Sequence, residues 1–192
     1  MLTEHLANFV AEQSADDIPD EVYAAARDAV VDSLGVALAG SREPVADIAA
    51  AWVSEMGTGT GATVWGRDLS CHSANTAFAN GISAHALDFD DSLPSGRGHI
   101  SACLVPTVLS MGEVSGASGR DILAAYAIGL EISGVIGRLF GPGHQRRGWH
   151  PTATVGSFAT TAAAARLSGF NDKSVAHALG IAGSQVAGLA RN

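Results

Sequence analysis

Basic and aromatic residues are scarce in this sequence. Its 192 residues include 11 Lys or Arg against 19 Asp or Glu, which gives a formal net charge of −8 at pH 7. Because nucleic acids bind basic protein surfaces, this balance argues against a nucleic-acid partner. Charged residues make up only 16% of the chain and hydrophobic residues 47%. This composition excludes disorder, which requires low hydrophobicity and high charge.

Cysteine is scarce as well. Cys71 and Cys103 are too few for a disulfide framework and lack metal-binding spacing, so we expect free thiols in a reducing compartment. The N-terminal segment carries an early acid and no basic stretch, so it does not resemble a signal peptide. Apolar runs are interrupted before they reach about eighteen residues, so the sequence predicts no membrane span. We therefore expect a cytoplasmic protein without a membrane partner.

Apolar residues recur at helical spacing along most of the chain. The pattern and its capping residues predict helices over 2–10, 19–40, 45–56, 74–89, 101–115, about 118–138, 152–167 and 171–185. We find no strand pairs and at most one short extended segment, at 63–66. The predicted class is an all-α, bundle-like domain of closely packed Ala/Gly-rich helices, and the length is sufficient for one core.

Two segments bear on the core and on ligand binding. The helix over 19–40 is apolar on more than one side, so we expect it deep in the core. Its Asp32 would then be a buried polar group that bonds a neighbouring backbone. The glycine-rich stretch 57–62 is not followed by Gly-Lys-Ser/Thr, which argues against a phosphate-binding loop.

The most informative stretch is 79–110. Five histidine and aspartate residues lie there within fifteen positions: His85, Asp88, Asp90, Asp91 and His99. Aspartate is disfavoured at a helix C-terminus, so the cluster needs a compensating role. A capped, solvated turn and a functional site explain it equally well. In a helix that continues to residue 89, His85 shares one face with Asp88 and Ser92, whereas Asp90 and Asp91 point elsewhere.

Two histidines, His99 and His150, each begin a predicted helix after a glycine-containing loop. A helix N-terminus attracts anions, and a histidine there adds a proton donor that titrates near neutrality. With Asp88 nearby, the pair predicts a pocket for a carboxylate-bearing substrate with acid–base groups. The rival interpretation is a metal site with ligands from His85, Asp88, Asp91, His99 and His150. No known ligand spacing supports it, so we predict no metal and no cofactor.

Five sequence blocks, which together extend over almost the whole chain, resemble in order those of the MmgE/PrpD family. That family includes 2-methylcitrate dehydratase, cis-aconitate decarboxylase and iminodisuccinate epimerase. The blocks are 18–22 with 32–40, 80–92 with its Ala-His-Ala-Leu-Asp-Phe-Asp-Asp, 99–102, the Gly-Trp-His-Pro-Thr-Ala-Thr of 148–154, and 178–185. The second block is specific, and its combination with the fourth is more so.

The resemblance implies a large all-helical domain, a smaller α+β lid domain and an active site between them, without metal or organic cofactor. Family members act on small di- and tricarboxylates by moving a proton at a carbon next to a carboxylate. The implied site has catalytic His99, His150 and Asp88, and substrate-binding Ser92, Asp91 and His85. Ser92 stands where the family usually has threonine, and Ile100 replaces the proline that usually follows the first catalytic histidine.

The family's lysine-bearing segment and lid lie beyond the 192 residues, so we expect residues 1–192 to be an incomplete helical domain. The predicted function is a lyase of the 2-methylcitrate dehydratase type that acts on a small di- or tricarboxylate. The alternatives are a catalytically incomplete subunit or truncated remnant, and an isomerase or epimerase of the iminodisuccinate type. The expected partners are the polycarboxylate substrate and either a second copy, in a homodimer, or a complementary lid-bearing chain.

Overall fold

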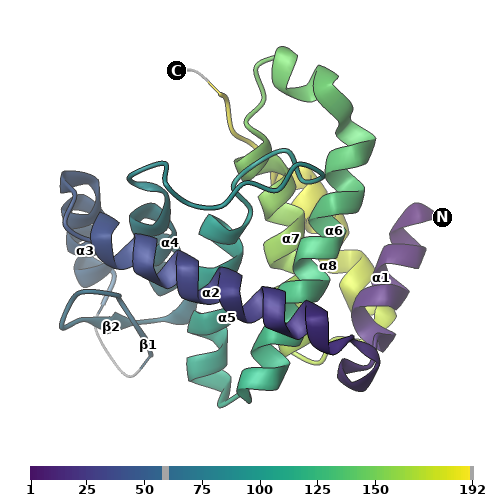
Figure 1. Cartoon of the computed structure of the whole chain (residues 1–192), viewed down its shortest axis with the longest axis horizontal. Coiled ribbons are helices and arrows are strands. Elements are labelled where there is room, and N and C mark those ends of the chain that lie inside the picture. Colours follow the sequence, from purple (N-terminus) through teal and green to yellow (C-terminus); the bar gives the residue numbers. More distant parts are fainter. Residues whose placement is uncertain (58–60, 191–192) are drawn as a thin grey trace.

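Helices dominate the computed structural model, which describes residues 1–57 and 61–190 (Figure 1). The helices are α1 (Leu2–Glu12), α2 (Asp20–Gly40), α3 (Pro44–Glu55), α4 (Ser73–His85), α5 (Ser101–Ser115), α6 (Gly119–Arg146), α7 (Pro151–Leu167) and α8 (Asp172–Gln185). A 3₁₀ turn, η1 (Ala15–Asp17), and an antiparallel pair, β1 (Ala62–Thr63) and β2 (Ser70–Cys71), complete the described elements. The predicted all-α class is confirmed. Residues 58–60 of the glycine-rich stretch lie outside the described residues.

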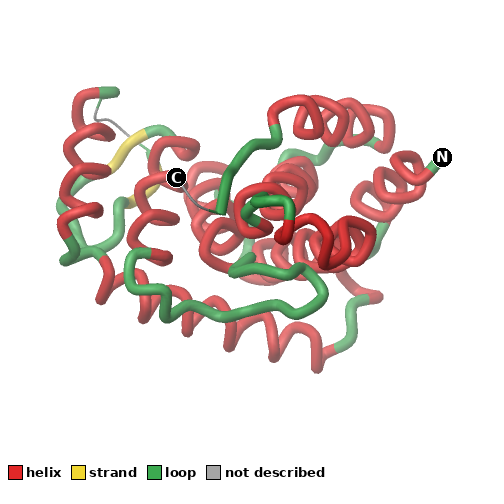
Figure 2. Tube along the Cα trace, turned by 90° about the horizontal axis from the view of Figure 1, so that it is seen from above, coloured by secondary structure: helices red, strands yellow, loops and turns green. Residues whose placement is uncertain are grey.

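The core is centred on α5, α6 and α7. Helix α6 packs along α7, α5 contacts both α4 and α7, and α1 packs against α8. The largest side chains that are almost completely buried come mainly from α5 and α6, and include Tyr126, Ile100, Leu104, Ile128 and Ile132. Figure 2 shows the small sheet at the end of the molecule opposite the N-terminus. Small residues on these helices permit the close approach of backbones.

Helix α6 is the longest described helix. Ser118 caps it with a reciprocal bond to Asp121, and the left-handed Gly141 (φ 60°) interrupts its regular dihedral angles near the end. Of the described helices, it alone is long and apolar enough to cross a membrane by length and composition. In the apolar 18-residue stretch of α6 that meets this test, 56% of the residues are buried inside the fold. The buried core helices of soluble proteins meet the same test of length and composition.

The prediction for the helix over 19–40 was wrong in its burial. Helix α2 runs across one face of the molecule (Figure 1), with one side against α4 and α6. Its other side is open, so Val31 is 64% exposed, Leu38 is 51% exposed, and Asp32 is exposed rather than buried. An apolar pattern on two sides does not by itself supply packing partners for both.

The helix predicted over 74–89 ends four residues early. Helix α4 stops at His85, and the following residues form a loop that leads to α5. Asp88 has a left-handed backbone (φ 52°), which a continuing helix does not allow. Low helix propensity and the unfavourable charge of three aspartates at a C-terminus account for the early end. The helical offsets that assigned these aspartates to faces are therefore not the ones they adopt.

Candidate active site

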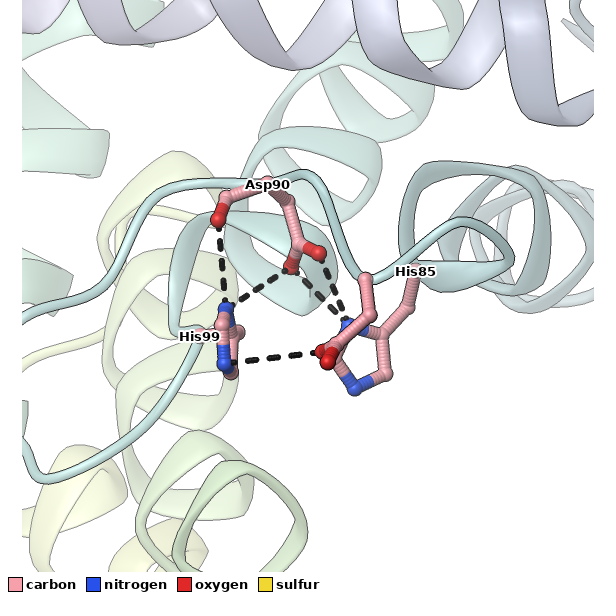
Figure 3. A group of neighbouring side chains, drawn as sticks. His85, Asp90 and His99 are labelled. Carbon is pink, nitrogen blue, oxygen red and sulfur yellow. Dashed lines mark hydrogen bonds and ion pairs between the residues drawn. The ribbon is translucent and has the colours of Figure 1, made fainter.

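His85 and Asp90 form the tightest pair in the candidate site. Nδ1 of His85 lies 3.0 Å from each carboxylate oxygen of Asp90, and the two residues point toward one another in Figure 3. The Asp90 side chain is 0% exposed and that of His85 is 32% exposed. With its proton on Nδ1, His85 donates to the carboxylate and leaves Nε2 free. This carboxylate–imidazole arrangement fixes the tautomer and the ring orientation.

His99 joins the pair from the other side of Asp90. Its Nδ1 is 3.2 Å from the Asp90 carbonyl oxygen and 3.6 Å from Oδ2, and its ring centroid is 5.1 Å from that of His85. Its Nε2 lies 3.7 Å from Oδ1 of Asp88, whose side chain is 81% exposed. The buried carboxylate of Asp90 therefore contacts both imidazoles, while the exposed Asp88 contacts His99 from the solvent side.

Asp90 is the residue that sequence reasoning missed. A helical register placed it away from His85, but the chain leaves the helix at His85 and returns through the left-handed Asp88. A contact made across such a turn follows no helical offset. The usable signal was the run of aspartates itself, because it favours a helix end rather than a continuing helix.

His150 reaches the same place from α7. It is the N-cap residue of that helix, and its ring centroid is 6.2 Å from that of His85. Its backbone amide donates to the Gly188 carbonyl at 3.1 Å, which fixes the start of the helix. His85 therefore lies within ring-contact distance of both predicted catalytic histidines, which come from the entrances of two different helices.

The entrances of α5 and α7 are tied together. The backbone amide of His99 donates to Oγ1 of Thr152 at 3.0 Å. Gly98 permits this approach, since a Cβ there would lie 2.7 Å from the Thr152 amide nitrogen. The sequence predicted a histidine near the start of both α5 and α7. The structure adds the contact between the two helix starts.

A cavity of about 640 Å³ opens beside these residues. Its polar lining includes His85, His150 and Thr152, and the first turns of α5 and α7 also line it. Much of the remaining wall is apolar and includes Phe78, Ile82, Met111, Ala102 and Ala153. His99 does not line the cavity. It contacts His85, which does.

Neighbouring charges and burial move the two cavity histidines in opposite directions. The hydrogen bond that His85 donates to Asp90 raises the pKa of His85, although partial burial opposes this. Burial lowers the pKa of His150, and the neighbouring His85 and His99 lower it further. Burial also raises the pKa of the Cys103 thiol, on the same cavity wall, to about 12. The lowered pKa favours the uncharged form of His150, and the raised pKa favours the protonated form of His85.

Asp91 and Ser92 lie apart from this cavity. Asp91 accepts a hydrogen bond from Ser101 and lines a second cavity of about 380 Å³ that none of the three histidines lines. Ser92 is exposed. Of the predicted site residues, the structure brings His85, Asp88, His99 and His150 together and places Asp91 and Ser92 to the side.

Four groups offer ligand atoms that all lie within 4.8 Å of one another, a spacing suited to a metal ion: His85, Asp88, Asp90 and His99. The set differs from that of the rival metal interpretation of the sequence, because it contains Asp90 and lacks Asp91 and His150. In the structure these groups pair with one another through the contacts given above.

The fold and the site define a helical domain that gathers imidazoles and carboxylates at helix ends beside one cavity. Residues 4–192 match the MmgE/PrpD N-terminal domain, and the chain belongs to the MmgE/PrpD family. The resemblance seen in the sequence is thereby confirmed.

Curated relatives of this chain are named cis-aconitate decarboxylases. The cis-aconitate decarboxylase-like protein oryM of Aspergillus oryzae is 30% identical over 98% of this chain and 41% of its own length. Human cis-aconitate decarboxylase is 27% identical over 94% of this chain and 39% of its own length. The Aspergillus terreus enzyme is 27% identical over 98% and 40%. The chain thus spans about 40% of the length of the curated relatives that it matches.

Proposed function

We propose that this chain carries the acid–base site of a lyase that acts on a small di- or tricarboxylate. The observation that carries the proposal is the meeting of His85 and His150 at one cavity, with ring centroids 6.2 Å apart and pKa values displaced in opposite directions. Groups whose environments separate their pKa values are suited to divide acid and base roles.

The substrate carboxylate binds at the entrance of α7. The amides of Thr152 and Ala153 belong to the first turn, where backbone N–H groups have no acceptor within the helix, and both residues line the cavity. The positive end of the helix dipole adds to this attraction for an anion. Protonated His85 donates from Nε2 to a second substrate oxygen, while its Nδ1 remains bonded to the buried Asp90.

The two imidazoles then move a proton at the carbon next to that carboxylate. In a decarboxylation, CO₂ leaves with the loss of one carboxylate, and protonated His85 delivers a proton to the carbon that takes up the electron pair. In a dehydration, neutral His150 removes the proton and His85 protonates the departing hydroxyl. General acid–base catalysis of this kind contributes about 10²–10⁴-fold to a rate.

The first substrate to test is cis-aconitate, because curated relatives over this region are named for its decarboxylation. The dehydration of 2-methylcitrate is the narrower prediction made from sequence and is tested beside it. Both reactions use His85 as the proton donor, to carbon in the decarboxylation and to the departing hydroxyl in the dehydration, and the dehydration also uses His150 as the base. A second copy, or a chain that covers the cavity, is the proposed partner.

The experiment is a substrate assay by NMR with cis-aconitate, citrate and 2-methylcitrate. We expect the wild-type chain to consume one of them, and His150→Asn to lower the rate about 10²-fold or more. The matched control is His177→Asn, an exposed histidine of α8, which should keep the wild-type rate. Equal rates in the two variants would refute the proposed role of His150.

A further inference from the structure

We infer that Asp91, Ser101 and Tyr126 form a positioning unit that holds the Asp90 carboxylate against the two histidines. The Ser101 hydroxyl donates to Oδ2 of Asp91 at 2.6 Å, and the Tyr126 hydroxyl lies 2.7 Å from it. Because the Ser101 proton goes to the carboxylate, Tyr126 is the donor to Ser101. Ser101 is 0% exposed and Tyr126 is 1% exposed. The unit thus connects the loop after α4 to α5 and α6.

The two adjacent aspartates serve opposite sides of this loop. Asp90 contacts His85 and His99, whereas Asp91 contacts Ser101 and lines the second cavity. One peptide bond joins them, so an anchor on the Asp91 side chain restricts where the Asp90 carboxylate can lie. Asp91 acts through its neighbour and does not touch the substrate cavity.

The loop needs such an anchor because its backbone is strained. Asp88 (φ 52°) and Arg97 (φ 60°) both adopt the left-handed region, which is unfavourable for residues with a side chain. Residues in such conformations persist only where surrounding contacts over-determine them. A backbone bridge between Leu93 and Gly98 closes the tip of the loop, and the partly buried Asp91–Ser101 bond fixes its base.

The same helix supplies a matched control for the test. Ser110 of α5 is 2% exposed, and its hydroxyl has no hydrogen-bond partner among the described residues. Ser101→Ala and Ser110→Ala therefore remove the same atom from two buried sites of one helix. Only the first removes a bond to the loop.

The readout is the tautomer and the pKa of His85, followed by ¹⁵N NMR of the imidazole ring. In the wild type and in Ser110→Ala, Asp90 should keep the proton on Nδ1. In Ser101→Ala, we expect His85 to shift toward the Nε2–H tautomer and its pKa to fall toward its ordinary value. A merely structural serine would lower stability and leave the tautomer of His85 unchanged.

A second variant keeps the inference testable if Ser101→Ala does not fold. Tyr126→Phe retains the buried ring and removes only the hydroxyl, so it should produce a smaller shift in the same direction. Asp91→Asn keeps an acceptor for Ser101 and should restore the wild-type tautomer that Asp91→Ala loses. A wild-type His85 spectrum in Ser101→Ala, or in Tyr126→Phe where Ser101→Ala does not fold, would overturn the inference.

The inference rests on the proposed function only where it gives Asp91, Ser101 and Tyr126 a part in catalysis. The NMR readout requires no substrate and no turnover, so it can succeed where the substrate assay fails. If both succeed, Ser101→Ala should also lower the turnover rate, while Ser110→Ala should not.

Discussion

The contact between Asp90 and His85 makes the sharpest prediction, for the substitution Asp90→Asn. The asparagine keeps the shape of the side chain, and its amide oxygen can still accept one bond from Nδ1 of His85. What it removes is a charge that is 0% exposed and lies 3.0 Å from the imidazole. The variant therefore tests the charge of Asp90 with little change in packing.

The expected magnitude follows from the class of bond that is lost. A hydrogen bond to a charged group contributes about 1.5–3 kcal/mol, and one between neutral groups about 1 kcal/mol. Because His85 remains 32% exposed, solvent screening places the difference near the low end, about 1 kcal/mol. We expect Asp90→Asn to lower the free energy of unfolding by about that amount at pH 6.

The loss depends on pH with a definite sign. Asp90 raises the pKa of His85 in the folded chain above its ordinary value of 6.5. Stability from this pair is therefore fully present below pH 6.5 and is lost as the pH rises through the raised pKa. Urea unfolding should show a larger deficit for Asp90→Asn at pH 6 than at pH 9, and NMR titration should show a lowered pKa for His85.

The control for this prediction is Asp88→Asn, since Asp88 is 81% exposed and makes only a distant contact with His99. It should leave the free energy of unfolding close to that of the wild type. If Asp90→Asn lost the same stability at both pH values, or left the pKa of His85 in place, the charge-assisted bond would not exist as described.

Three further predictions concern the surroundings of the site. Gly98→Ala would place a Cβ 2.7 Å from the Thr152 amide nitrogen, and should lower the free energy of unfolding by about 1–3 kcal/mol in a urea titration. Asn80→Ala removes two hydrogen bonds to the backbone near β1 and should cost about 1–3 kcal/mol by the same measurement. Cys103, whose thiol pKa is about 12, should resist alkylation by iodoacetamide at pH 8 until the chain unfolds, as followed by mass spectrometry.

The helices were predictable because each has a local signature. Apolar spacing, the cap at Ser118 and the cap at Asn171 gave the starts of α6 and α8 close to where they lie. These signals act within one turn of a helix and need no knowledge of the rest of the chain. The extent of α2 was also correct, but its burial was not, because burial depends on what packs against each side.

The site was predictable in its residue types and less so in its arrangement. His99 and His150 lie at helix entrances as expected, since both follow glycine-containing loops. The central position of His85 depends on where α4 ends, and the role of Asp90 depends on the left-handed turn at Asp88. Contacts across an irregular loop are set by tertiary anchors such as Ser101, which no sequence period records.

The most direct test of the proposed function is deuterium incorporation in D₂O, which reports proton movement even without net product. The wild-type chain is incubated with cis-aconitate or citrate, and NMR follows exchange at the carbons next to carboxylates. We predict exchange in the wild type and in His177→Asn, and its loss in His150→Asn and His85→Asn. Exchange that persists in both site variants would contradict the assignment of these two histidines, and no exchange in the wild type would contradict the proposed lyase function of this chain.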